Sequence, residues 1–80
     1  MMLQPQIIDV KPLENYKLFL SYETGENKLF DVIPYISGDW FGKLRDIKVF
    51  NTVRVSGLSI VWADGQDIAP HELYENSYII

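Results

Sequence analysis

Residues 59–74 read SIVWADGQDIAPHELY, and they predict a strand, a tight turn, a second short strand and the start of a helix. Asp64-Gly65 separates the apolar run 60–62 from Asp67-Ile68, and this residue pair suits the positive φ angles of a hairpin turn. Pro70 follows. Because proline has no N–H for a sheet ladder but fits the first position of a helix, we expect a short helix over residues 70–74. This stretch predicts local structure, but none of these features indicates a chemical activity.

The rest of the chain predicts further strands, because short β-branched or alternating segments are separated by proline and glycine turns. The expected strands are residues 6–10, 16–22, 27–32, 49–55 and 58–62, with turns at 11–15, 23–26 and 56–57. Between Pro34 and Asp46 we expect a compact loop with one helical segment, since Trp40 and Leu44 are spaced four residues apart. The apolar tail, residues 76–80, either packs on the sheet, adds a strand or meets another chain.

Together these elements predict one α+β domain over residues 1–80, with an antiparallel sheet of five or six strands and one or two short helices. The 80 residues contain no cysteine and one histidine, which removes disulfides and the usual structural zinc sites. The chain must rely on its apolar side chains, which make up 48% of the sequence. We expect no cofactor.

The charge is uneven along the chain. Residues 55–80 carry four carboxylates and no Lys or Arg, which accounts for the whole net charge of −4. That half would repel a phosphate backbone, so we expect no direct nucleic-acid ligand and favour a basic protein partner. No apolar run approaches the roughly 20 residues of a membrane span, and the first residues lack the order of a signal peptide. We therefore expect a cytoplasmic protein that does not bind membranes.

Several segments of the sequence together resemble a known family. They are the strand–turn–strand segment 18–31, then Pro34, Phe41, Leu44 and Phe50, and finally the block IVWADGQDIAP at 60–70 followed by Glu72, Leu73 and Tyr74. In these features the chain resembles the bacterial family called domain of unknown function 2442. The resemblance implies an α+β fold with an antiparallel sheet, no established enzymatic activity, and an antitoxin-like role beside a small protein encoded by a neighbouring gene. Ala69 departs from the better capping residue that members often carry.

His71 is the one side chain that could act as a general base near neutral pH without a large pKa shift. Serine catalysis would also need a nucleophile elbow, and residues 56–59 lack its glycine-flanked pattern, so we interpret His71 as a surface residue in a first helical turn. Asp64, Asp67 and Glu72 offer oxygen ligands for a hard cation, but their spacing does not match a calcium loop. Turn and helix N-terminus chemistry accounts for them better, so we expect no metal.

Three aromatic residues and one acid complete the candidates. Trp62 alternates with the apolar residues of its strand, so we expect it in the core. Trp40 and Phe41 lie in a glycine-bounded loop and could form an exposed patch, although we favour core packing because a small domain needs its large apolar side chains. Asp31 ends a strand and is expected to cap the turn at Pro34, with contact to a partner's arginine as the second interpretation.

The sequence therefore predicts a non-enzymatic protein-interaction module. Its candidate partner contacts are Asp31, Trp40, Phe41, Asp64, Asp67 and Glu72. Two alternatives stay open: a small enzyme or ligand-binding domain that uses His71 with nearby carboxylates, and a dimeric accessory domain that self-associates through the apolar tail and an open sheet edge.

Overall fold

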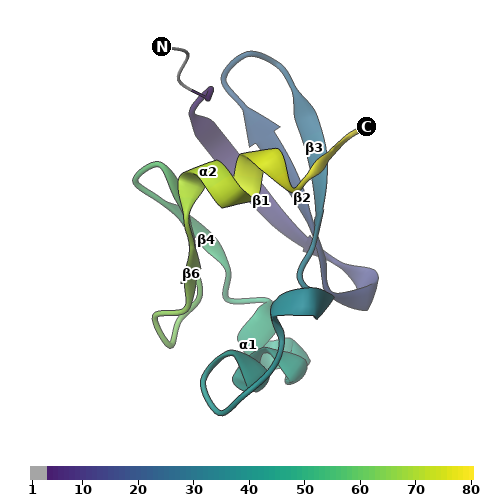
Figure 1. Cartoon of the computed structure of the whole chain (residues 1–80), viewed down its shortest axis with the longest axis vertical. Helices are drawn as coiled ribbons and strands as arrows, with labels where there is room; N and C mark the ends of the chain where they lie inside the picture. Colours follow the sequence, from purple (N-terminus) through teal and green to yellow (C-terminus); the bar gives the residue numbers. More distant parts are fainter. Residues whose placement is uncertain (1–3) are drawn as a thin grey trace.

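The computed structural model describes residues 4–80. These residues form two antiparallel sheets with short helices around them (Figure 1). The large sheet has the strand order β1 (Ile7–Leu13), β2 (Lys17–Tyr22), β3 (Asn27–Asp31) and β7 (Tyr78–Ile79). The small sheet has the order β4 (Arg54–Ser56), β5 (Ser59–Val61) and β6 (Asp67–Ile68). The α-helices are α1 (Ile47–Phe50) and α2 (Pro70–Glu75), and the 3-10 helices are η1 (Glu14–Tyr16), η2 (Ile33–Tyr35) and η3 (Phe41–Arg45).

The large sheet has one buried face and one outward face. Along β2 the buried side chains are Leu18, Leu20 and Tyr22, while the residues between them are partly exposed. This is the alternation that the sequence predicted for residues 16–22, and it follows from the two-residue repeat of a strand. Helix α2 crosses the buried face, and the small sheet lies beside it (Figure 1).

The core lies between the two sheets and the helices. Its fully buried large side chains include Trp62 and Phe50, whose ring centroids are 6.2 Å apart. The indole Nε1 of Trp62 donates a hydrogen bond to the Phe50 carbonyl oxygen at 2.9 Å, so the polar atom of this buried ring is paired. The prediction that Trp62 belongs to the core is confirmed.

Residues 59–74 fold into the predicted strand, turn, short strand and helix. Gly65 has a φ of +94° and its N–H donates to the Trp62 carbonyl at 2.9 Å, while Trp62 N–H donates to the Gln66 carbonyl at 2.9 Å. These bonds close the hairpin between β5 and β6. Helix α2 begins at Pro70, and the preceding Ala69 gives it no side-chain cap. The fold class is therefore α+β.

The predicted turn at residues 11–15 is wrong, because β1 continues through Lys11 and Pro12 to Leu13. Pro12 pairs with Leu18. A proline is tolerated there because β1 is an edge strand of the large sheet and its missing N–H breaks no ladder on the outer side. The chain instead turns at Asn15 and Tyr16, which have φ angles of 61° and 59°.

The predicted strand at residues 49–55 is also wrong over most of its length. Residues 47–50 form α1, and the strand is limited to Arg54–Ser56. The Asp46 carboxylate accepts a hydrogen bond from Lys48 N–H at 3.0 Å, which caps the helix, and Phe50 is buried in the core. Cap and burial together outweigh the strand preference of a β-branched segment.

The expected single sheet of five or six strands is replaced by seven strands in two sheets over residues 4–80. Of the three expectations for the tail, the structure shows the added strand: Tyr78 pairs with Leu29, Ile79 pairs with Lys28, and Ile80 N–H donates to the Asn27 carbonyl at 3.0 Å. Within the described residues, no helix is long and apolar enough to cross a membrane.

Candidate binding surface

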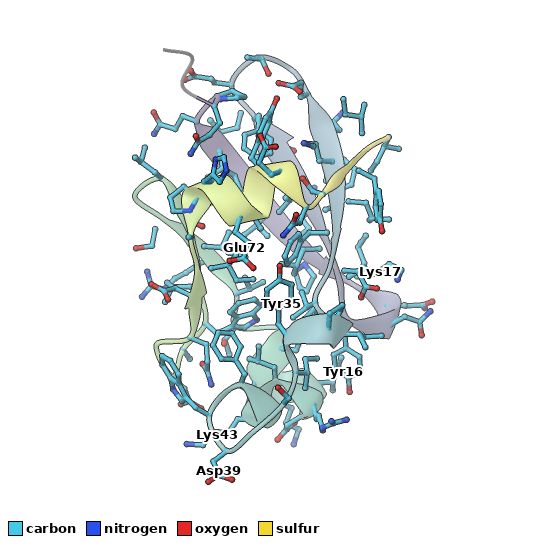
Figure 2. All side chains as sticks on the ribbon, viewed as in Figure 1. Tyr16, Lys17, Tyr35, Asp39, Lys43 and Glu72 are labelled. Carbon is cyan, nitrogen blue, oxygen red and sulfur yellow. The ribbon has the colours of Figure 1, made fainter. Side chains whose placement is uncertain are left out.

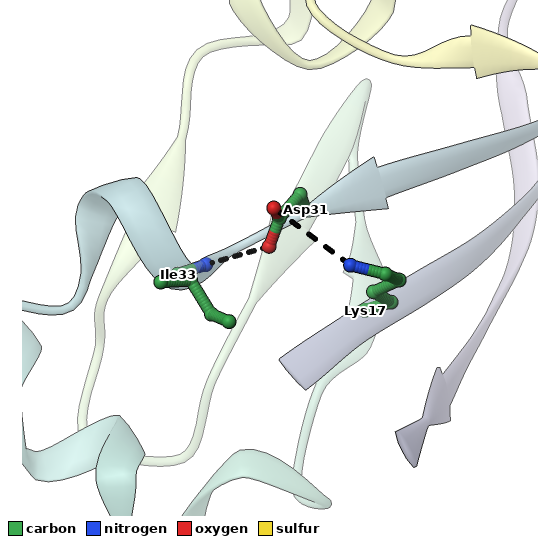
Figure 3. A network of polar contacts seen from close by, with 3 residues as sticks. All are labelled: Lys17, Asp31 and Ile33. Carbon is green, nitrogen blue, oxygen red and sulfur yellow. Dashed lines mark hydrogen bonds and ion pairs between the residues drawn. The ribbon is translucent and has the colours of Figure 1, made fainter. Parts of the chain in front are cut away.

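Asp31 lies where β3 ends, and both oxygens of its carboxylate have partners (Figure 3). One oxygen accepts a hydrogen bond from Ile33 N–H at 3.0 Å, and the other lies 3.8 Å from Lys17 Nζ. The carboxylate therefore starts the turn of η2 that contains Pro34, as predicted. Its side chain remains about a third exposed at 35%.

Trp40 is 48% exposed, so the prediction that it packs in the core is wrong. Two hydrogen bonds hold Trp40 at the surface. The Trp40 Nε1 donates to the Asp64 carbonyl at 3.3 Å, and the Trp40 carbonyl accepts from Gln66 Nε2 at 2.8 Å. Phe41 meets the Trp40 ring edge-on at 5.5 Å and packs partly against the core. Trp40 and Asp64 thus lie together, because the loop before η3 is tied to the turn between β5 and β6.

Glu72 points from the first turn of α2 toward Tyr35 (Figure 2). Burial raises the pKa of Tyr35, and the nearby Glu72 carboxylate raises it further. His71 and Asp67 are exposed. Across residues 4–80 no group of three histidine, aspartate or glutamate side chains could hold a metal ion. The structure therefore does not gather the six predicted contact residues at one place, although it pairs Trp40 with Asp64.

A groove of about 760 Å³ lies elsewhere, where the loop after β2 meets the end of α2. Three carboxylates line it: Glu23 and Glu26 from the β2–β3 loop, and Glu75 from α2. Tyr74 and Leu58 contribute to the wall, and Leu58 is 62% exposed. Among the described residues that line the groove there is no Lys or Arg. The groove combines three carboxylates with apolar surface.

Hydrogen bonds fix one of these carboxylates. Thr24 Oγ1 donates to Glu26 at 2.8 Å, and the Tyr74 hydroxyl donates to the same carboxylate at 2.8 Å. The bond from Thr24, followed by the bond from Tyr74, lowers the pKa of Glu26, while the Glu26 carboxylate raises the pKa of Tyr74. Glu26 is therefore ionised at neutral pH, and it is oriented before any partner arrives.

A buried cation lies behind this wall. Lys28 is 6% exposed, its Nζ donates to the Tyr74 carbonyl at 2.6 Å, and it lies 3.7 Å from the centroid of the Tyr74 ring. A cation over an aromatic face that also donates to a carbonyl has its charge compensated inside the protein. Lys28 fixes Tyr74 and through it Glu26, without lining the groove.

The groove was not predicted from the sequence, in which the net negative charge falls on residues 55–80. In the structure Glu75 meets Glu23 and Glu26, which are about fifty residues earlier in the chain. The available signal was the acidic glycine turn at residues 23–26, which we interpreted only as a loop. Its exposed carboxylates become a site through the packing of α2.

The ring of Tyr22 packs edge-on against Tyr74 at 5.2 Å, and its hydroxyl is buried without a hydrogen-bond partner in the described structure. Burial raises the pKa of Tyr22 to about 12 from 10.0. A group whose pKa is raised on folding stabilises the fold fully below its unfolded pKa and stops doing so as the pH rises through the folded pKa. We predict that the protein loses stability between about pH 10 and 12, and that Tyr22→Phe loses less.

Urea unfolding followed by circular dichroism across this pH range measures the effect. At neutral pH Tyr22→Phe should be neutral or stabilising by up to about 1 kcal/mol, because it removes an unpaired buried hydroxyl. Tyr78→Phe is the matched control, since that side chain is 65% exposed. Equal alkaline loss in both variants would show that the Tyr22 hydroxyl is not the group responsible.

Comparison with known proteins places the chain without assigning it an activity. No curated protein and no solved structure matches it. One family does match, over residues 7–78, and its description is "Protein of unknown function (DUF2442)". The match runs from the start of β1 to the first residue of β7, so it includes every other strand and helix described above in full. The chain therefore belongs to the DUF2442 family of proteins of unknown function.

Proposed function

We propose that this protein is a non-enzymatic interaction module of the bacterial cytoplasm that binds a basic segment of a small partner protein, in an antitoxin-like role. The observation that carries the proposal is the groove between the β2–β3 loop and α2, with three carboxylates and no lining Lys or Arg. The implied role of its relatives beside a neighbouring gene product supports a protein ligand.

The groove fits the chemistry of an arginine or lysine side chain. Glu26 is held ionised by Thr24 and Tyr74, so its orientation does not have to be acquired on binding. A guanidinium can make two parallel hydrogen bonds to a carboxylate, and Glu23 and Glu75 can take further cationic groups. The exposed Leu58 side chain offers apolar surface to the methylene stem of such a residue. The volume lies within the range of about 300–1,000 Å³ typical of ligand sites.

The net charge of −4 adds a long-range contribution, because it raises the encounter rate with a positively charged partner. Asp64, Asp67 and Glu72 contribute to this field. As direct contacts they remain predictions, as do Asp31, Trp40 and Phe41.

The test is a pull-down of the neighbouring gene product after co-expression, followed by titration of the isolated complex. We predict that Glu23→Gln with Glu75→Gln weakens the affinity at least about 10-fold, which corresponds to about 1.4 kcal/mol. Glu26 is left unchanged because it also bonds to Tyr74. The affinity of the parent protein should fall as salt is raised, since exposed charges are screened.

Asp39→Asn with Glu14→Gln is the matched control, because neither residue lines the groove. It removes the same charge from exposed positions, and Asp39 lies at the end of the molecule opposite the β2–β3 loop (Figures 1 and 2). It should change the affinity about 2-fold or less, as expected for rim charges that act at long range. Equal weakening in both double variants would show that Glu23 and Glu75 act only through the net charge of the protein and make no specific contact with the partner. Absence of any complex at low salt would contradict the proposal itself.

A further inference from the structure

The outward face of the large sheet carries a continuous row of side chains across all four strands. The register places Lys11 of β1 beside Phe19 of β2, Phe19 beside Leu29 of β3, and Leu29 beside Tyr78 of β7. Directly paired residues point to the same face of a sheet, so these four side chains form one row with three apolar members.

This row has no layer over it within the described structure. Leu20 and Lys28, which alternate with the row, point to the buried face, where Lys28 bonds to Tyr74 of α2. Phe19 and Leu29 do not pack against the hydrophobic core, although both are large and apolar. Tyr78 is 65% exposed. Phe19 and Leu29 are half-buried and Tyr78 is exposed, so one face of the sheet presents a continuous apolar stripe that is partly open to solvent, which is typical of an interaction surface.

Charged residues flank the stripe along the strands. The next row in one direction contains Lys17 paired with Asp31, which Figure 3 shows at the ends of β2 and β3. The next row in the other direction contains Asp9 paired with Ser21, and Ser21 paired with Asn27. Across β2 and β3 the face thus has a cation beside an anion at one end, an apolar centre and a neutral polar end, while the edge strand β1 adds the Asp9 carboxylate at that second end.

We propose that this face binds a second copy of the same chain, sheet against sheet, about a two-fold axis parallel to the strands. Such an axis places each row opposite the same row of the other copy in reversed order. Lys17 then faces Asp31 of the second copy and Asp31 faces its Lys17. In the central row Phe19 faces Leu29 of the second copy, and Lys11 lies over the ring of its Tyr78, which is a favourable cation–π arrangement.

The alternative two-fold axis, across the strands, is disfavoured by charge. It would place Lys11 against Lys11 of the second copy, and it would leave Lys17 opposite Ser21 and Asp31 opposite Asn27, without a charged partner. The pairing of Lys17 with Asp31 therefore favours the two-fold axis parallel to the strands. Because the face carries both a cation and an anion, it suits a second copy of the chain better than a partner of a single charge sign. The two sheets would pack about 10 Å apart, as in a sandwich. This inference does not rest on the proposed groove, which is formed by other residues.

Sedimentation equilibrium and velocity of the full chain over a wide concentration range test the proposal. The parent protein should reach twice its 9.3 kDa mass as the concentration rises. Phe19→Lys should remain a monomer, because it places a charge at the centre of the stripe. Ile47→Lys is the control, since Ile47 is an apolar residue of α1, outside the large sheet and 48% exposed, and it should dimerise like the parent. A parent protein that stays monomeric, or a Phe19→Lys protein that dimerises normally, would overturn the proposal.

A charge exchange then tests the pairing. Lys17→Glu and Asp31→Lys should each be monomeric alone, because each places like charges opposite one another twice. Mixed in equal amounts, they should form a heterodimer with both pairs attractive. Circular dichroism checks that each variant is folded. If Asp31→Lys does not fold after losing its bond to Ile33, Lys17→Glu alone decides: normal dimerisation of that variant would contradict the pairing.

Discussion

Replacing Trp62 by alanine is expected to lower the free energy of unfolding by about 3–5 kcal/mol, the range for removing a large buried aromatic side chain. Trp62 is fully buried and packs on Phe50, which is equally buried. Domains of this kind have a total stability of about 5–15 kcal/mol, so the loss is a large part of the whole. Urea unfolding followed by far-ultraviolet circular dichroism measures the change.

The two tryptophans form a matched pair for this experiment. Trp40→Ala removes the same side chain from a site that is 48% exposed and should cost about 1 kcal/mol or less. Trp62→Phe separates packing from hydrogen bonding, because it keeps a ring but leaves the Phe50 carbonyl only the longer bond from Val53 N–H at 3.4 Å. We expect a loss of about 1–3 kcal/mol. Similar losses from the two alanine variants would contradict the assignment of Trp62 to the core.

The fold was predictable where local chemistry acts alone. The hairpin between β5 and β6 depends on Asp64-Gly65, and α2 begins at Pro70, so both follow from a few adjacent residues. The alternation in β2 likewise states which side chains face the core. These elements were predicted because the preferences of their own residues agree with the backbone geometry that the fold requires there.

Elements that depend on distant contacts were not predicted. Helix α1 occupies a segment with strand preference because the Asp46 cap and the burial of Phe50 favour helix there. Trp40 lies at the surface because its partners, Asp64 and Gln66, are more than twenty residues away. The Asp46 cap is a local signal, but the burial of Phe50 and the distant partners of Trp40 are not visible in a local pattern, so the strand predicted at residues 49–55 and the core position predicted for Trp40 were both wrong.

The groove was unpredictable for the same reason. Its three carboxylates come from two segments that meet only after α2 has packed across the sheet. A sequence shows how many charges a chain carries, while the fold decides which of them share a surface. Lys28 illustrates the point, because it alternates with outward-facing residues of β3 and so lies on the buried side, beneath Tyr74.

Lys28→Glu is therefore expected to lower the free energy of unfolding by about 3–5 kcal/mol, the cost of leaving an uncompensated charge inside a protein. The new carboxylate would face the Tyr74 carbonyl, which can only accept hydrogen bonds, and would lie near the ionised Glu26. Lys28→Met keeps most of the volume and should cost about 1.5–3 kcal/mol, because it removes one hydrogen bond from a charged donor.

Lys43→Glu is the control, since Lys43 is exposed in η3 at the other end of the molecule and the same charge change should cost about 0.5 kcal/mol or less. Because Lys28 also holds Tyr74, the Lys28→Met protein should bind the basic partner less tightly even where it remains folded. A Lys28→Glu protein as stable as Lys43→Glu would show that the ammonium group is not buried against α2, and the support for Tyr74 and Glu26 at the groove would then be lost as well.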